Sequence, residues 1–486
     1  MNESQQKMTE AEVSTYVRDF ERRTGVFAER VNGSAVWQLI RFEVSVRIQG
    51  LGLERVPVGR RRLVGSLLRG FFQFFRLPRS SYLCKTFDSA YRRETPAGFE
   101  DIYFDELKSV MPVMIKVSSS DAAGYEQRIA KASQPPVFDD TSVIALSAIL
   151  GRLFPVVVRN SAFETISRAI TSELGFEDYT PARIRRVYNV FWWRVMLYRL
   201  VLRRVRPKAV LCPDNGQFGL MSAAQYFDIP YIEMQHGVFT HVHPNALPPD
   251  LSEDEARGLL MPSSFAVYGK FSADVLQDSW LYMNNRVHPV GAPFLERARA
   301  VRVSQYRPGA VPRITLSTQG IARKALGNFV AEFLRLCEEQ FELVIKLHPA
   351  YDHDQNFYEE LFGDDPRVVI DSGASANSTH TFIARSDFHI SISSTCHYDA
   401  LGIGTPTGIL ALETHESVAD LLDVSGACLI ETPADLARMV RDRAFGVVPD
   451  ETSRYFFEHD FSGRVEAVLA SMSVAPDASD RNMVAV

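Results

Sequence analysis

Short apolar runs alternate with helical stretches throughout the second half of the chain. From about Arg206, PKAVLCPD predicts a buried strand, FGLMSAAQYFD a helix and IPYIEMQ the next strand, which together make a βαβ unit. Further apolar runs are separated by helical stretches such as GNFVAEFLRLCEEQ. These runs are RITLST, FELVIKLH, PRVVID, DFHISIS and PTGILAL. The alternation predicts an α/β fold class with two doubly wound, Rossmann-like domains.

A weakly periodic stretch rich in proline, glycine and arginine separates the two sets of runs. It reads NRVHPVGAPFLERARAVRVSQYRPGAVPR, a composition typical of an interdomain connection. We therefore expect an N-terminal domain over residues 1–300 and a C-terminal domain over residues 301–470. The last residues, 471–486, are small and polar, and we expect them to form a flexible tail.

Two segments of the N-terminal half are strongly basic. No acidic residue occurs between Arg55 and Lys85, where GRRRLVGSLLRGFFQFFRLPRSS mixes arginines with leucines and phenylalanines. Such a segment fits a peripheral contact with an anionic membrane through Arg60–Arg79, or equally a core helix with a solvated arginine face. The second segment, PARIRRVYNVFWWRVMLYRLVLRRVRPK, has apolar residues at helical spacing, which favours a structural helix.

Composition narrows the class of protein. The chain has 486 residues, of which 46% are hydrophobic and 23% charged, and a formal net charge of −6. These values fit a folded protein and give no sign of nucleic-acid binding. The five cysteines are scattered, which argues against a disulfide framework and fits a cytoplasmic location. The polar N-terminus lacks the apolar core of a signal peptide.

Polar residues gather where the predicted strands end, which is where open parallel sheets bind ligands. One strand ends at Asp214, followed by Asn215 and Gly216; the next ends in Gln235-His236-Gly237. If these strands are neighbours, Asp214 and His236 face the same site. His241 and His243 follow in a loop that would line an acceptor entrance or simply be solvated.

The second domain has a matching set of strand ends. In FELVIKLHP the strand period puts Lys346 and His348 on one face, and Pro349 ends the ladder. In ISISSTCHYDALGIGTP, residues Ser393–Thr395 lead into a helix, a position that favours a phosphate. Asp399, one turn into that helix, would accept hydrogen bonds from a ribose. No spacing in the sequence demands a metal ion.

At this level the sequence resembles a known family. PDNGQFGLMSAAQYFDIPYIEMQHGVFTHVHP, YGKFSADVL, VHPVGAPFLE, VIKLHP and SISSTCHYDALGIGTP resemble segments of the GT-B glycosyltransferases of bacterial capsule and surface-polysaccharide biosynthesis. Relatives with a similar order of motifs include Kdo transferases, sialyltransferase-like enzymes and, more distantly, teichoic-acid glycerophosphotransferases. The resemblance covers about residues 185–415. Asp399 departs from it, because such enzymes more often have glutamate there.

The resemblance implies two Rossmann-like domains facing a cleft, with the nucleotide-sugar donor on the C-terminal domain and the acceptor on the N-terminal one, usually without a metal or other cofactor. It implies His236 as the base, with Asp214 the close competitor and Glu233 beside them. The implied donor-binding residues are Lys346, His348, Pro349, Ser393, Ser394, Thr395, Asp399 and Gln319, and the implied acceptor-binding residues are Asn215, Gly216, Gln235, Gly237, His241 and His243.

The expected activity is therefore transfer of a sugar from a CMP- or UDP-linked donor to a surface-polysaccharide or lipid-linked glycan, with the inversion at the anomeric carbon that the resemblance implies. Three alternatives stay open: a CDP-polyol phosphotransferase, a nucleotide-sugar 2-epimerase, and a non-catalytic scaffold of glycan assembly. A lipid-linked acceptor would place the protein on the inner face of the cytoplasmic membrane.

Overall fold

The computed structural model divides into two compact units. Unit 2 contains Tyr268–Ser272 and Pro289–Arg464, and unit 1 contains the rest of the chain. The structure describes residues 8, 10–50, 60–119, 126–214, 216–237, 239, 242–243, 245–280, 286–348, 352, 354–372 and 378–473. No helix in these ranges combines the length and the apolar character needed to cross a membrane.

The main sheet of unit 1 has the strand order β11-β10-β9-β8-β3-β6-β7 in the described part of the chain. From β10 to β7, neighbouring strands pair in parallel. The strands are β3 (Tyr82–Phe87), β6 (Met114–Ser119), β7 (Phe138–Asp139), β8 (Ala209–Cys212), β9 (Tyr231–Met234), β10 (Ser264–Val267) and β11 (Val287–Pro289). The smaller pairs are β1 (Arg30–Val31) with β2 (Ser34–Ala35) and β4 (Tyr91–Thr95) with β5 (Gly98–Asp101).

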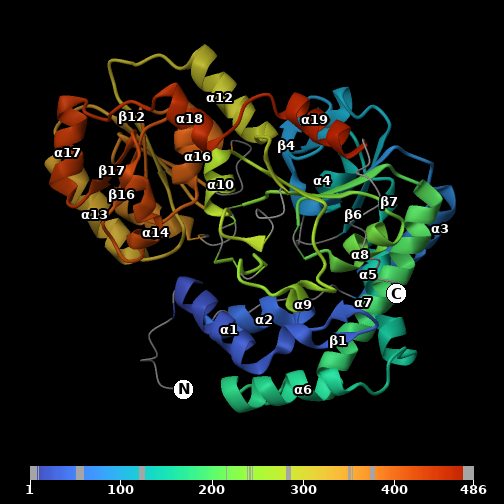
Figure 1. Ribbon diagram of the computed structural model, residues 1–486. Helices are drawn as coiled ribbons and strands as arrows, with labels where there is room; N and C mark the ends of the chain where they lie inside the picture. Colours follow the sequence, from blue (N-terminus) through green and yellow to red (C-terminus); the bar gives the residue numbers. More distant parts are fainter. Residues whose placement is uncertain are drawn as a thin grey trace. The chain divides into compact units, whose positions relative to one another are not determined.

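The helices of unit 1 include a row in which α3 packs on α5, α5 on α7 and α7 on α8 (Figure 1). The bounds are α1 (Glu10–Thr24), α2 (Gln38–Ile48), α3 (Arg60–Arg76), α4 (Glu126–Ala130), α5 (Thr141–Leu153), α6 (Ser161–Ala169), α7 (Pro181–Val205), α8 (Phe218–Tyr226) and α9 (Glu253–Ala256). The buried core of this unit joins α1 and α2 to α7 and to the sheet.

The long helix α7 confirms the structural interpretation of the second basic segment. Thr180 caps it by accepting from the Arg183 N–H at 3.3 Å, and Pro181 begins it, both common at helix starts. Ile184, Tyr188, Phe191, Val195, Tyr198 and Leu202 are buried along one side. The first basic segment differs. The core-helix interpretation is wrong for most of the apolar side chains of α3, because Val64, Leu68, Phe71, Phe72 and Phe75 are exposed, while Phe74 packs against the core.

Unit 2 is built on a parallel sheet with the order β14-β13-β12-β15-β16-β17. Its strands are β12 (Arg313–Ser317), β13 (Glu342–Lys346), β14 (Val368–Asp371), β15 (Phe388–Ser391), β16 (Thr407–Leu410) and β17 (Ala427–Ile430). The helices are α12 (Pro293–Gln305), α13 (Arg323–Leu336), α14 (Gln355–Phe362), α15 (Thr379–Arg385), α16 (Cys396–Ile403), α17 (Pro433–Asp442) and α18 (Asp450–Phe456). Two further helices, α10 (Lys270–Val275) and α19 (Phe461–Ser473), begin in unit 2 and end in unit 1.

Helices of unit 2 form two groups on the sheet: α13 packs with α14 and α17, while α12 packs with α15 and α16 (Figure 1). The predicted fold class, α/β with two doubly wound Rossmann-like units, is confirmed by these sheets. Every apolar run predicted as a strand in the second half of the chain forms one. Helix α19 extends to Ser473, and residues 474–486 of the predicted tail lie outside the described residues.

Candidate functional site

In unit 1, the predicted catalytic residues follow two neighbouring strands. β8 and β9 pair in parallel, with Cys212 opposite Glu233. Asp214 comes two residues after β8, and His236 two residues after β9. Because the carboxyl ends of parallel strands meet at one edge of a sheet, both residues lie at the same edge. Asn215 and His241 lie outside the described residues.

Asp214 is tied into the turn that leads to α8. One carboxylate oxygen accepts the Gly216 N–H at 2.7 Å, and the other accepts the side-chain amide of Gln217 at 2.7 Å. These bonds fix the carboxylate and leave its negative charge near His236. Asp214 is therefore placed to orient a neighbouring group.

His236 is exposed, although the surrounding protein desolvates its ring enough to lower its pKa. The positive charge of Arg92 lowers the pKa further, while Asp214 opposes the shift. A lowered pKa leaves the imidazole neutral at pH 7, with a nitrogen free to accept a proton. The preceding Gln235 is buried and donates from its side-chain amide to the Gly237 carbonyl at 2.8 Å, which braces the turn that carries His236.

Glu233 has a different protonation state. It is 4% exposed, and burial, followed by the charge of Asp214, raises its pKa to about 8. At neutral pH this carboxyl is mostly protonated, so it is a proton donor rather than a base. It lines a cavity of about 20 Å³ together with Gln38, Arg41 and Asn245, enough room for about one water molecule.

His243 belongs to the packing of the loop that follows β9. Its ring lies 4.5 Å from that of Phe239 and 6.1 Å from that of Phe42 on α2. Nδ1 accepts the Asn245 N–H at 3.1 Å, which puts the ring proton on Nε2. Burial, then His236 and Arg41, lowers its pKa to about 4, so the ring is neutral.

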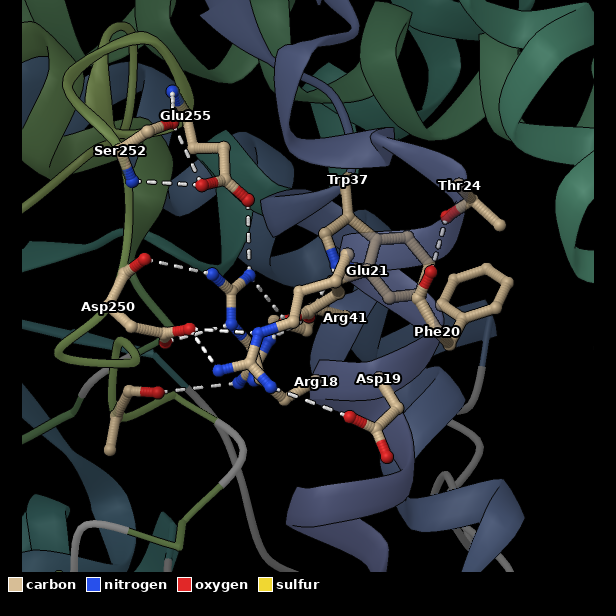
Figure 2. Close-up of polar contacts among 12 residues, drawn as sticks. Arg18, Asp19, Phe20, Glu21, Thr24, Trp37, Arg41, Asp250, Ser252 and Glu255 are labelled. Atoms are coloured by element: carbon tan, nitrogen blue, oxygen red, sulfur yellow. Dashed lines mark hydrogen bonds and ion pairs between the residues drawn. The ribbon is translucent and has the colours of Figure 1, made fainter.

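The N-terminal helices hold this loop from outside the sheet, which the sequence did not predict. Figure 2 shows Arg18 of α1 reaching Asp250 and Glu255, at 2.9 Å and 3.1 Å. Glu21, fully buried, accepts from Trp37 Nε1 at 2.8 Å and from Arg41 Nε at 2.6 Å. We call residues 10–48 the N-terminal clamp and residues 245–262 the clamped loop.

Further bonds join the clamp to the clamped loop. Gln38 donates to the Leu260 carbonyl at 2.7 Å and accepts the Leu260 N–H at 2.8 Å. The Arg41 guanidinium donates to the Ala246 carbonyl at 3.4 Å. Since Arg41 also lines the cavity of Glu233, the clamp reaches the candidate catalytic residues through a buried ion pair.

In unit 2, the predicted donor-binding residues follow neighbouring strands of the parallel sheet. Gln319 follows β12, and its side-chain oxygen accepts the Ser393 N–H at 3.1 Å after β15. The Ser393 hydroxyl lies 2.9 Å from the hydroxyl of Thr414, which follows β16. Ser394 is buried and accepts the Cys396 N–H at 3.2 Å, whereas Thr395 is exposed.

The start of α16 leaves backbone donors unused. Among the described residues, no hydrogen bond is made by the backbone N–H of Ser394 or Thr395. Both N–H groups directly follow Ser393, whose hydroxyl contacts that of Thr414, and they lie at the positive end of the helix dipole. Free amides, hydroxyls and a helix N-terminus together form an anion-binding arrangement.

Lys346 and His348 take different positions at the end of β13. Lys346 is 3% exposed and pairs with Asp371, and its ammonium also donates to the Ser372 carbonyl at 2.7 Å. His348 is half-buried, and its N–H donates to Thr318 at 3.3 Å. Lys346 thus joins the ends of β13 and β14, while His348 is only half-buried at the edge of the sheet. Pro349 lies outside the described residues.

Behind the anion-binding arrangement lies a buried polar chain that the sequence did not reveal. The Ser317 hydroxyl lies 2.9 Å from His389 Nε2, and Thr407 Oγ1 lies 2.8 Å from His389 Nδ1 and 2.6 Å from His397 Nδ1. Burial lowers the pKa of His389 and brings that of His397 to about 4, so both rings are neutral. These hydrogen bonds fix the first turn of α16 to the sheet.

Asp399 points to a partner rather than to open solvent. Its carboxylate lies 2.9 Å from His380 Nε2 on α15, and the His380 ring lies 5.1 Å from that of Phe294. The described residues contain no group of three or more His, Cys, Asp or Glu side chains placed to hold a metal ion.

No protein-family model and no curated protein matches this sequence. Among solved structures, a UDP-N-acetylglucosamine 2-epimerase is 13% identical, with a TM-score of 0.46 over 82% of this chain and 96% of the other. The wall teichoic acid polymerase TagF is 11% identical, with a TM-score of 0.42 over 85% of this chain and 98% of the other. MurG of Acinetobacter baumannii is 12% identical, with a TM-score of 0.42 over 82% of this chain and 99% of the other. Likenesses at this level indicate neither a reaction nor a substrate.

Proposed function

We propose that this chain is a metal-independent glycosyltransferase that moves a sugar from a nucleotide-sugar donor to a surface-polysaccharide or lipid-linked glycan. The observation that carries the proposal is the start of α16 in unit 2. There, the N–H groups of Ser394 and Thr395, which bond to no described residue, directly follow Ser393, whose hydroxyl contacts that of Thr414. This is the chemistry that a leaving nucleotide phosphate requires when no metal neutralises it.

Other residues of unit 2 complete the proposed donor site. His348 is a half-buried residue that follows β13, and its imidazole is assigned to the phosphate. Gln319 holds the Ser393 N–H and so positions the loop before α16. Lys346, paired with Asp371, supports the strand end on which His348 lies. Asp399, beside His380, is assigned to the ribose.

The acceptor is assigned to unit 1, with His236 as the base. The acceptor oxygen forms the new bond to the anomeric carbon with inversion, its proton passes to the neutral imidazole, and the anomeric bond to phosphate breaks. Asp214 stabilises the imidazolium, as carboxylates do beside catalytic histidines. Glu233, which is protonated at neutral pH because its pKa is about 8, donates a hydrogen bond. Gln235, Gly237 and His243 shape the acceptor side.

The proposal includes a cytoplasmic location with peripheral membrane contact through Arg60–Arg79. A lipid-linked acceptor lies at the membrane surface, so an enzyme that extends it works there. The basic composition of this segment suits the anionic lipids of that surface.

A thermal-shift panel with CMP, CDP, UDP, GDP and ADP tests the donor site. A nucleotide that binds only the folded chain increases the free energy of unfolding by about 2.7 kcal/mol at a hundredfold excess over Kd, and so raises the Tm. We expect one nucleotide class, CMP or UDP, to raise the Tm. Ser393→Ala and His348→Ala should lose most of that rise, whereas Ser304→Ala, on the exposed face of α12, should keep it.

The reaction separates the remaining alternatives. His236→Gln should keep the nucleotide-induced rise in Tm and lose about 10²–10⁴-fold in sugar transfer, as expected for removal of a general base. Conversion of the donor sugar without any acceptor would indicate a 2-epimerase, and a response to CDP with transfer of a polyol phosphate would indicate a phosphotransferase. No response to any nucleotide at millimolar concentration would favour a scaffold.

A further inference from the structure

Helix α3 displays its apolar face to solvent. Val64, Leu68, Phe71, Phe72 and Phe75 are between 56% and 60% exposed. Their spacing of three and four residues places them on one side of the helix. An amphipathic helix of a soluble protein normally buries this side, so the exposed stripe indicates a surface that something else covers.

The opposite side of α3 explains why the helix has this orientation. Ser66 and Gly70 are buried against the protein, and a Cβ on Gly70 would lie 2.1 Å from the Ser142 hydroxyl of α5. Gln73 accepts the Asp139 N–H at 2.8 Å, and Arg204 of α7 donates to the Phe75 carbonyl at 2.6 Å. Small and polar residues, together with Phe74, therefore hold the helix against the protein, and Phe71, Phe72 and Phe75 are left outside.

Exposed apolar residues also occur along α5, which packs beside α3 (Figure 1): Leu146 and Ile149 are 37% and 39% exposed. At the end of α5 and beyond it, Leu153, Phe154, Val156 and Val158 are 41% to 63% exposed. This segment is held firmly, because the buried Asn189 of α7 accepts the N–H groups of Val156 and Val157 at 2.7 Å and 3.0 Å. Its apolar side chains are thus presented on a fixed backbone.

The segments that carry this surface are basic, and the nearby Asp139 pairs with Arg69 of α3 at 3.6 Å. Residues 60–85, 141–160 and 181–213, which contain α3, α5, the 154–158 segment and α7, include no aspartate or glutamate and many arginines. Two copies of such a surface would repel each other, whereas an anionic surface would attract it. Arginines beside exposed phenylalanines fit the headgroup and acyl layers of a bilayer.

We propose that α3 and the 153–158 segment together form one membrane-docking surface for anionic lipid, wider than the Arg60–Arg79 segment alone. The proposal deepens the membrane contact that the proposed function includes. The apolar stripe of α3 enters the interface between headgroups and acyl chains, and the 153–158 segment binds beside it. The arginines of α3, α5 and α7 contact lipid phosphates.

Co-sedimentation with vesicles tests this surface. The full chain should bind vesicles of phosphatidylglycerol and phosphatidylcholine at least tenfold more than vesicles of phosphatidylcholine alone, and the binding should weaken with salt. Leu68→Gln/Phe71→Gln/Phe75→Gln should reduce the binding at least tenfold, and so should Phe154→Gln/Val156→Gln. The matched control is Leu361→Gln/Val447→Gln, which alters exposed apolar residues of unit 2 and should bind as the unmodified chain does.

Each variant is also tested for its Tm and for its Tm rise with nucleotide, which we expect to match the unmodified chain. If the unmodified chain does not bind the vesicles but its Tm still rises with nucleotide, this inference is wrong and the proposed donor site is unaffected. Equal binding of the triple variant and the unmodified chain also overturns it. So does a dimer, seen by analytical ultracentrifugation, that the triple variant abolishes, because a second copy would then be the partner.

Discussion

At the residue scale, the protonation of Glu233 makes stability depend on pH in a defined direction. Burial raises its pKa from 4.5 to about 8 in the folded chain. Between these two pH values the unfolded chain loses a proton that the folded chain keeps, so this residue's contribution to stability falls as the pH rises. Glu233→Gln removes the effect, and we expect its Tm to exceed that of the unmodified chain by about 2–6 °C at pH 8.

The comparison at pH 5 serves as the internal control for Glu233→Gln. At that pH the protonation of Glu233 differs less between the folded and the unfolded chain, so the gain in Tm from the substitution should be smaller than at pH 8. Glu342→Gln, which replaces an exposed carboxylate of β13, provides the matched variant and should show no such pH dependence. A gain in Tm that is the same at pH 5 and pH 8 would contradict the assigned protonation of Glu233.

Several residues of the candidate site could be predicted because they directly follow an apolar run. Asp214, His236, His348 and Ser393 belong to this group, since the end of a buried strand is visible in the sequence. Their partners could not be predicted in the same way. Arg41, Thr414 and His380 come from distant segments, and only the fold brings them to Ala246, Ser393 and Asp399.

At the scale of elements, the clamp depends on the buried pair of Glu21 and Arg41. Both side chains are almost fully buried, at 0% and 5% exposed. Removing one charge leaves the other without its partner, which typically costs about 3–5 kcal/mol. We expect Glu21→Gln to lower the free energy of unfolding of unit 1 by about 3 kcal/mol, measured by urea denaturation.

Arg23→Ala is the control for the clamp. Arg23 pairs with Glu173 at 2.9 Å on the surface, with side chains 54% and 31% exposed, and such pairs contribute about 0–1 kcal/mol. If Glu21→Gln costs no more than Arg23→Ala, the buried pair is not what holds α1 and α2 together.

Two glycines of α3 give opposite predictions. Gly70→Ala places a methyl group 2.1 Å from the Ser142 hydroxyl and 3.0 Å from the Asp139 carbonyl, so we expect a loss of about 1–3 kcal/mol from overpacking. Among the described residues, no atom outside this helix's own backbone lies within 4 Å of the position that a Cβ on Gly65 would take. Gly65→Ala should therefore raise the free energy of unfolding by up to about 1 kcal/mol. Thermal unfolding measures both, and a loss for both variants would contradict the described packing of α3 on α5.

The orientation of α3 also marks a limit of the sequence at this scale. Its amphipathic pattern predicts a helix, and two uses of the apolar face were equally compatible with that pattern. The side that packs is decided by the close approach at Gly70, which depends on Ser142 in a segment far along the chain. The clamp was missed for the same reason, since its bonds to residues 246–260 cross more than 200 positions.

At the scale of the whole molecule, each unit carries one part of the proposed reaction at the carboxyl edge of a parallel sheet. The alternating runs of the second half predicted the sheet of unit 2 and the β8–β9 pair of unit 1. They did not predict β3, β6 and β7, which lie in the first 140 residues and add to the same sheet. Local patterns there are interrupted by the β4–β5 hairpin, so long-range pairing rather than periodicity defines these strands.

Hydrogen–deuterium exchange of the full chain, with and without the nucleotide that raises its Tm, tests the central claim most directly. The claim is that a nucleotide phosphate binds at the start of α16 and the ends of β12 and β13. We predict slower exchange in peptides containing residues 317–319, 346–348 and 391–396. Slowing confined to unit 1, or no slowing anywhere at a saturating nucleotide concentration, would contradict the proposed donor site.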